Sequence, residues 1–379
     1  YPSKDVLFYQ SDIRGNLLTA ERIRALKAIH EQERVTLVTT FDALMNTMAP
    51  IEKMWENVLT LEQGQLLDLK EIQAALIRMG YEKEYQVQTM GQFSVRGGIL
   101  DVFPLTEENP IRIELWGDEI DTIRYFDCES QKSIENIDRV SIYPAAELVL
   151  SDEEKAGGID KLKAEAKRVS DKLRKQMKTE EAHRVTVMAD ELTEEWGELS
   201  MYAGMDAFLS YFFDERVGLL DYFNPSDSLI FFDELTRCAE QGKLTETEFS
   251  ESMKQRLAMG YILPGQMNGL FTEKEIVAKL EKYSCIALGA LDNKANGLHQ
   301  LGSYGIHCQS VSPYNNSFEL LIKDLKRYKK NGYRVILLSG SRTRAKRLSE
   351  DITDQGITCF YTENYDHELF EGQIMVCYG

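Results

Sequence analysis

The feature that most constrains the fold of this chain is a pair of glycines, Gly97 and Gly98, between two apolar runs. On one side, the sequence QFSVR alternates apolar and polar residues, as on a strand with one buried face. On the other side, ILDVF forms a return run that ends at Pro104. Because paired glycines supply the positive φ that a tight turn requires, we expect a β-hairpin here.

The same alternation continues after the hairpin. Residues 111–116 place isoleucine and leucine on one face and Arg112 and Trp116 on the other, and a further strand is predicted over residues 120–126. Together with Arg96 of the first strand, Arg112 and Trp116 form a predicted outer face of planar side chains, a type enriched at binding hot spots. By spacing alone, solvated arginines and a tryptophan that covers a small core are the more common case.

The two motifs resemble a known family. GQFSVRGGILDVFP at residues 91–104, followed by IRIELWGDEIDTIRYFD at residues 111–127, resembles the second domain of the bacterial transcription-repair coupling factors (Mfd) and of the related UvrB proteins. In that family this domain is a docking surface for the excision-repair protein UvrA. The resemblance extends to YPSKDVLFYQSDIRGN at residues 1–16, and more loosely over the chain after residue 147.

By this resemblance, the UvrA-binding residues are Arg96, Arg112 and Trp116. Trp116 stands where relatives often carry phenylalanine, so its aromatic character is kept and its size is not. The two guanidinium groups would offer planar forks to carboxylates of UvrA, and the indole would supply an apolar anchor.

The resemblance also implies how the work is divided along a longer protein. We expect RNA polymerase and double-stranded DNA to bind parts outside this chain, where the motor that uses ATP and Mg also lies. A C-terminal domain of the same protein is expected to mask the docking face until polymerase is engaged. The expected function of this chain is therefore to recruit UvrA to stalled RNA polymerase in nucleotide excision repair. We expect it to have no catalytic residue, no cofactor and no metal site.

The charge of the chain favours a protein partner over nucleic acid. Its 62 acidic residues outnumber its 44 basic residues, which gives a net charge of −18. DNA-binding surfaces gain most of their affinity from lysines and arginines that neutralise phosphates, so the overall field opposes DNA. A helix predicted over residues 161–178 is locally basic, and a solvated helix face is the commoner explanation of such a pattern.

The cysteines and the apolar segments indicate in which cellular compartment the protein is expected. Six cysteines are dispersed without a CxxC pair, which is typical of a reduced, cytoplasmic protein. No apolar run approaches the ~20 residues needed to cross a membrane. The chain begins with Tyr1, and we expect an excised fragment whose last unit is cut short.

The order of the predicted elements indicates an α/β protein in four parts. Residues 1–48 and 147–315 are expected to form a degenerate helicase-like (RecA-like) α/β domain, into which a small α+β docking domain of residues 49–146 is inserted. Residues 316–379 alternate helices and strands, which predicts a small Rossmann-like α/β domain with a parallel sheet.

Hydrophobic patterns predict the individual elements. A helix over residues 69–79 should end at Gly80, because glycine favours the left-handed cap conformation. Further helices are predicted over residues 41–48, 205–213 and 318–328. Strands are predicted over residues 35–40, 140–143, 185–188, 229–235, 283–291, 306–311, 335–338, 357–361 and 374–378.

Asp233 and Glu234 suggest the alternative function of a UvrB-like helicase or excinuclease subunit that binds ATP and DNA. An apolar strand that ends in Asp-Glu is how a Walker B motif holds Mg²⁺. That chemistry also needs a phosphate loop of the form GxxxxGK[ST], which this sequence does not contain. The long DNA-inserting hairpin of UvrB also has no room, because residues 9–15 lead almost directly into the first predicted helix.

Overall fold

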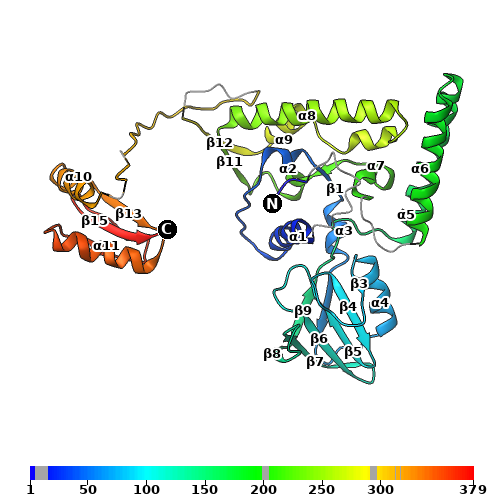
Figure 1. Ribbon diagram of the computed structural model, residues 1–379, viewed down its shortest axis with the longest axis horizontal. Helices are drawn as coiled ribbons and strands as arrows, with labels where there is room; N and C mark the ends of the chain where they lie inside the picture. The colour runs from blue at the N-terminus through cyan, green and yellow to red at the C-terminus, as the bar shows by residue number, and fades with distance from the viewer. Residues whose placement is uncertain (5–15, 199–204, 291–296, 312, 316) are drawn as a thin grey trace. The chain divides into compact units, whose positions relative to one another are not determined.

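The computed structural model is a mixed α/β protein (Figure 1). It divides into two compact units, Tyr1–Leu301 and Gly302–Gly379. The structure describes residues 1–4, 16–198, 205–290, 297–311, 313–315 and 317–379. The segment of residues 9–15, predicted to be too short for a DNA-inserting hairpin, lies outside the described residues.

A six-stranded sheet contains the predicted hairpin. Its strands, in spatial order, are β3 (Glu82–Lys83), β4 (Gln92–Arg96), β5 (Ile99–Val102), β6 (Ile111–Trp116), β7 (Glu119–Phe126) and β8 (Ser133–Ile137). β3 and β4 are parallel, and the other neighbours are antiparallel. Gly97 has a φ of 61°, which the hairpin turn requires. The predicted hairpin and the two strands after it are confirmed, whereas β8 was not predicted.

One face of this six-stranded sheet packs into a hydrophobic core. Phe93, Leu100 and Ile113 are fully buried there, against Leu76 of α4 (Leu69–Arg78). The helix ends as predicted, because Gly80 adopts a φ of 90°. A short antiparallel pair closes the region, β2 (Leu59–Glu62) with β9 (Arg139–Ile142), which confirms the strand predicted over residues 140–143. The opposite face of the six-stranded sheet is therefore the one left to carry polar side chains.

The rest of the first unit combines helices with two short sheets. Its elements outside the α5–α6 region are α1 (Asn16–Glu31), α2 (Phe41–Met45), β1 (Thr47–Met48), α3 (Ile51–Trp55), β10 (Val217–Gly218), η2 (Leu219–Tyr222), β11 (Leu229–Asp233), α8 (Leu235–Ala258), η3 (Pro264–Asn268), α9 (Glu273–Leu280) and β12 (Ser284–Leu288). β11 and β12 are parallel, as in an α/β layer, and β1 and β10 are antiparallel. Helix α8 packs so closely on α2 that a Cβ at Gly242 would lie 2.5 Å from the Phe41 ring.

A helical hairpin follows β9 in the chain. α5 (Asp152–Lys175) and α6 (Thr179–Glu198) lie side by side (Figure 1), against the 3-10 helix η1 (Met205–Phe208) and α7 (Leu209–Phe212). A capping box of Ser151 and Glu154 starts α5. The residue Met177, which shares the helical spacing of the buried face, lies instead in the turn between the helices, where it is 89% exposed.

The second unit has a three-stranded parallel sheet, as predicted for residues 316–379. Its elements are α10 (Phe318–Lys330), β13 (Val335–Ser339), α11 (Arg342–Asp354), β14 (Phe360–Tyr361) and β15 (Ile374–Tyr378), with the strand order β13-β15-β14. β15 is buried at the centre. β13 is not the buried strand that its apolar sequence suggested, because Ile336 and Leu338 are exposed on one side.

Three predicted strands are wrong. Residues 35–40 and 306–311 form no strand, and residues 185–188 belong to α6. All three are short apolar segments, a pattern that does not by itself separate a strand from a helix or an unpaired extended segment. Val185 is buried together with Ala182 and Ala189, which is helical spacing. Strand formation also requires a neighbouring strand in register, and a single segment does not specify one.

Candidate interaction surface

The polar face of the six-stranded sheet is organised around one buried carboxylate, Asp101. The two-residue turn aligns Ser94 with Asp101, and the next strand places Arg112 opposite Asp101. Asp101 is 1% exposed. Its Oδ2 lies 3.0 Å from Arg96 Nη2 and 2.9 Å from Arg112 Nη2, and its Oδ1 lies 2.7 Å from Arg112 Nε. Arg96 and Arg112 are thus brought together on one face by a shared partner.

Arg112 is held more tightly than was expected for a group that offers its fork to a partner. Its Nη2 also donates to Gln131 Oε1 at 2.8 Å, and its guanidinium lies 4.2 Å from the centroid of the Phe126 ring. The hydrogen bonds to Asp101 raise the pKa of Arg112 above its usual value. Its side chain is 13% exposed, against 36% for Arg96. Arg112 therefore does not present a free guanidinium group to a partner, as was expected, because this group already binds both carboxylate oxygens of Asp101.

A second ion pair continues the same face. Arg124 on β7 binds both carboxylate oxygens of Glu114 on β6, with Nη1 2.9 Å from Oε2. Thr122 Oγ1 also donates to Glu114. The hydrogen bond from Arg124 is the main cause of a lowered pKa for Glu114. The face is consequently an ordered ionic surface in which each charged side chain has a fixed neighbour.

Trp116 lies at the end of β6 and is 84% exposed. Regular alternation along β6 predicts the same side as Arg112 and Glu114, about 13 Å from Arg112. The pairing of β6 with β7 shifts register between Glu114 and Leu115, just before Trp116. Gly117, with a φ of 66°, turns the chain immediately afterwards. Arg96 and Arg112 therefore share the face that holds Asp101, and the indole lies at the margin of the sheet.

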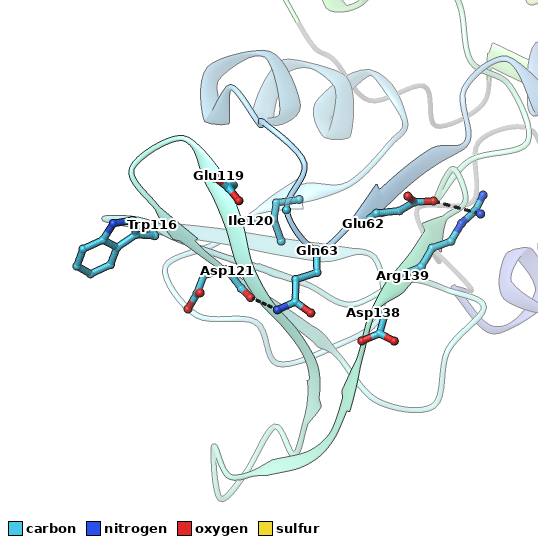
Figure 2. Close-up of a pocket in the computed structure, with 9 residues that line it drawn as sticks. Glu62, Gln63, Trp116, Glu119, Ile120, Asp121, Asp138 and Arg139 are labelled. Atoms are coloured by element: carbon cyan, nitrogen blue, oxygen red, sulfur yellow. Dashed lines mark hydrogen bonds and ion pairs between the residues drawn. The ribbon is translucent and has the colours of Figure 1, made fainter.

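A hollow of about 610 Å³ lies beside Trp116. Its lining residues are Glu62, Gln63, Gly64, Trp116, Glu119, Ile120, Asp121, Asp138 and Arg139. Figure 2 shows the Trp116 indole directed away from the acidic side chains of this lining. Arg139 pairs with Glu62 at 3.2 Å, and Gln63 Nε2 donates to the Asp121 carbonyl at 2.7 Å. The margin of this sheet face is thus acidic, whereas its centre holds arginines.

Asp101 and Gln131 were missed at the level of sequence. A signal for Asp101 exists, because a two-residue turn at Gly97 and Gly98 fixes the pairing of the strands on either side. That register places a carboxylate between Arg96 and Arg112. No comparable signal identifies Gln131, which reaches Arg112 from the loop between β7 and β8.

The strand end at Asp233 and Glu234 makes a structural connection. Glu234 has a φ of 58° at the junction between β11 and α8, and its carboxylate accepts a hydrogen bond from the Ala290 amide at 2.8 Å. This bond ties the end of β11 to the segment after β12. Within the described ranges, no cluster of three or more His, Cys, Asp or Glu residues could hold a metal ion. None of the helices that the structure describes is long and apolar enough to span a membrane.

Comparison with known proteins bears out the resemblance seen in the motifs. Residues 59–148 match the family model described as the UvrB interaction domain. The whole chain is 27% identical to the transcription-repair-coupling factor of Bacillus subtilis (strain 168) and 25% identical to that of Staphylococcus haemolyticus (strain JCSC1435). Over 94% of its length it is 26% identical to the Staphylococcus aureus (strain MRSA252) protein.

The chain spans about a third of the length of these relatives, 32%, 32% and 30% respectively. The residues matched to the UvrB interaction domain contain Arg96, Asp101, Arg112 and Trp116. Along its entire length, this chain is therefore similar to part of the transcription-repair-coupling factors, and its ionic sheet face lies within the region that matches the UvrB interaction domain.

Proposed function

We propose that this chain is the protein-interaction part of a transcription-repair coupling factor and that it recruits UvrA to stalled RNA polymerase in nucleotide excision repair. The observation that carries the proposal is the ordered face of the six-stranded sheet, which combines two arginines on a buried aspartate with an exposed indole. The match of residues 59–148 to the UvrB interaction domain supports it. The similarity of the whole chain to transcription-repair-coupling factors also supports it.

The face would recognise its partner through two kinds of contact. Arg96 is exposed enough to pair with a carboxylate of UvrA while Asp101 holds its guanidinium in place. Trp116 would bury its indole in an apolar pocket of the partner, as hot-spot tryptophans do. Arg112 acts as a positioning residue, because it fixes Asp101 and contributes charge from beneath the surface.

The remaining partners would bind elsewhere in the longer protein. RNA polymerase, double-stranded DNA, and ATP with Mg would engage parts that lie outside the third of the relatives' length spanned here. A C-terminal domain would mask the docking face until polymerase is bound. The protein would work in the bacterial cytoplasm.

The proposal gives this chain no ATPase and no DNA-unwinding activity. The sequence contains no GxxxxGK[ST] phosphate loop, and Glu234 is already used as a hydrogen-bond acceptor at a strand end. We expect no ATP turnover above background in a phosphate-release assay with Mg²⁺ present. Measurable turnover that is lost in Glu234→Gln would favour the alternative of a UvrB-like helicase subunit.

Calorimetry with purified UvrA tests the docking role. Truncation of one hot-spot side chain typically costs about 2 kcal/mol or more, so Arg96→Ala with Trp116→Ala should weaken binding at least a hundredfold. The matched control is Tyr304→Ala, which removes a 93% exposed aromatic side chain from the second unit. Unchanged UvrA affinity in the double variant, with the fold intact by circular dichroism, would contradict the proposal.

Charge reversal at Arg112 is a poorer test. A glutamate there would stand beside the buried carboxylate of Asp101, so loss of binding could follow from unfolding. The two variants above leave the Asp101–Arg112 pair in place.

A further inference from the structure

Helix α5 and the turn after it concentrate positive charge in a chain that is acidic overall. Between residues 161 and 178, eight basic residues stand against two acidic ones, a local net charge of +6 in a chain of net charge −18. All eight basic residues are exposed. They are Lys161, Lys163, Lys167, Arg168, Lys172, Arg174, Lys175 and Lys178.

Helical spacing sorts these side chains into two rows on the flanks of α5, either side of its solvent-facing crest. Lys163, Lys167 and Arg174 form one row, which is about 16 Å long at 1.5 Å per residue. Lys161, Arg168, Lys172 and Lys175 form the other row, which is about 21 Å long. Leu162, Ala166 and Leu173 lie on the buried side of the helix, so packing directs both rows towards solvent.

Few of these cations are neutralised by their surroundings. Lys161 pairs with Asp214 at 3.0 Å and Arg168 with Glu165 at 4.0 Å, and both pairs are solvent-exposed on the cation side. Among the described residues, the other six cations have no acidic partner within 4 Å. Five of the seven acidic residues of α6 lie near its C-terminal end, within residues 190–198, and the other two, Glu180 and Glu181, lie in its first turn.

The pairing of α5 with α6 keeps most of the acidic side chains of α6 away from the second half of α5. Ser170 Oγ donates to the Ala182 carbonyl at 3.1 Å, which aligns the second half of α5 with the first half of α6 in antiparallel fashion. The acidic end of α6 therefore lies along the first half of α5, away from Lys172 and Arg174. The end of the hairpin that holds the turn, residues 171–184, still carries five basic residues against three acidic ones.

We propose that the cationic rows of α5 contact the phosphate backbone of duplex DNA without reading its sequence. This goes beyond UvrA docking and departs from the expectation that double-stranded DNA meets only parts outside this chain. Phosphates recur every ~3.4 Å along one strand, so a row of 16 to 21 Å spans about five or six of them. The overall charge of −18 limits the affinity of the chain for DNA, so α5 would add to DNA binding by other parts of a longer protein.

The composition of the exposed surface favours a duplex over other partners. Between residues 161 and 178, Met177 in the turn after α5 is the one exposed apolar side chain larger than alanine, and the two cationic rows themselves hold none. A protein partner would need an apolar or aromatic anchor among the rows. A single strand would need aromatic rings on which bases could stack. Flexible lysines without such groups fit the delocalised charge of a duplex backbone.

Fluorescence anisotropy with a labelled duplex of about 30 base pairs tests this proposal with the whole chain. Four phosphate contacts would give a slope of log K against log salt near −3.6, or about a hundredfold weaker binding from about 50 mM to about 200 mM salt. Two duplexes of unrelated sequence should bind equally. The variant Lys163→Glu, Lys167→Glu, Arg174→Glu should bind at least tenfold more weakly at the lower salt concentration and show a shallower slope.

A control variant separates this local effect from the change in net charge. Lys323→Glu, Lys326→Glu, Lys330→Glu on α10 reverses three exposed cations in the second unit and should retain binding. Thermal unfolding should show that both variants are folded. The proposal is overturned if the wild-type chain shows no salt-dependent binding, or if both variants lose affinity equally. It is also overturned if light scattering shows that the α5 cations drive salt-sensitive self-association instead.

Discussion

The two groups of cations in this molecule are held in opposite ways. On the six-stranded sheet, Arg96 and Arg112 converge on Asp101, and Arg112 is largely covered by its neighbours. On α5, lysines and arginines extend into solvent, and most have no acidic partner among the described residues. The first arrangement fixes the geometry of a charge, and the second provides an attractive field of low precision. A surface that must select one protein needs the former, and a contact with a uniform polyanion needs only the latter.

The largest effect in this comparison should come from Asp101. Asp101→Ala leaves Arg112 covered and without its carboxylate, and breaking such a buried pair costs roughly 3–5 kcal/mol. Urea unfolding followed by circular dichroism should show that loss, together with loss of UvrA binding. Asp121→Ala, which removes an exposed carboxylate from the margin of the same sheet, is the matched control. Equal stability of the two variants would mean that Asp101 does not organise the face.

A third ionic cluster, at Glu147, extends the comparison to pH. Glu147 contacts Arg22 at 2.8 Å and Lys4 at 2.9 Å. Burial by itself would raise the pKa of Glu147, but the two cations lower it from 4.5 to about 2. Because the folded-state pKa is lowered, the stability that Glu147 provides is present above pH 4.5 and is lost as the pH falls towards 2.

We expect this loss of stability to reach up to about 3 kcal/mol. It is measured as the decrease in the free energy of unfolding by urea when the pH is lowered from about 6 to about 3 and below. In Glu147→Gln the free energy of unfolding should fall less steeply below about pH 4.5, because the glutamine side chain does not ionise. If it falls as steeply as in the wild type, other carboxylates are responsible.

A smaller effect is expected from Arg112→Lys. Lysine keeps the charge but not the fork that binds both oxygens of Asp101. We expect a loss of about 1–2 kcal/mol in the free energy of unfolding and weaker binding of UvrA. Arg139→Lys, at a pair that is more than half exposed, should change stability by less than ~0.5 kcal/mol. Similar losses at Arg112 and Arg139 would mean that a covered ion pair contributes no more to stability than an exposed one.

The smallest effect should come from α5 itself. Lys163→Gln, Lys167→Gln, Arg174→Gln replaces three exposed cations that have no acidic partner within 4 Å among the described residues, so the free energy of unfolding should change by less than ~0.5 kcal/mol. A destabilisation above about 2 kcal/mol would show that these cations support the helical hairpin. In that case their charge would not be available to a partner.

Helix α4 and the six-stranded sheet could be predicted from sequence far better than the other elements of the first unit. The hairpin, helix α4 and three consecutive strands follow from alternation and from Gly80 and Gly97. Such signals are local, because a turn residue and a period of two act within a few positions. The segments of residues 35–40 and 185–188 are also apolar but have no turn residues beside them. Their secondary structure depends on contacts with segments distant in sequence, and neither forms a strand.

By itself, the sequence determined the family resemblance, the strands that carry Arg96, Arg112 and Trp116, and the overall acidity of the chain. Only the tertiary structure decided that Arg112 turns inwards to Asp101 and that α5 directs its cations outwards. The physical reason is that the orientation of a charged side chain depends on partners from other strands and helices. Residue type fixes the charge, whereas packing decides whether that charge is paired or exposed to solvent.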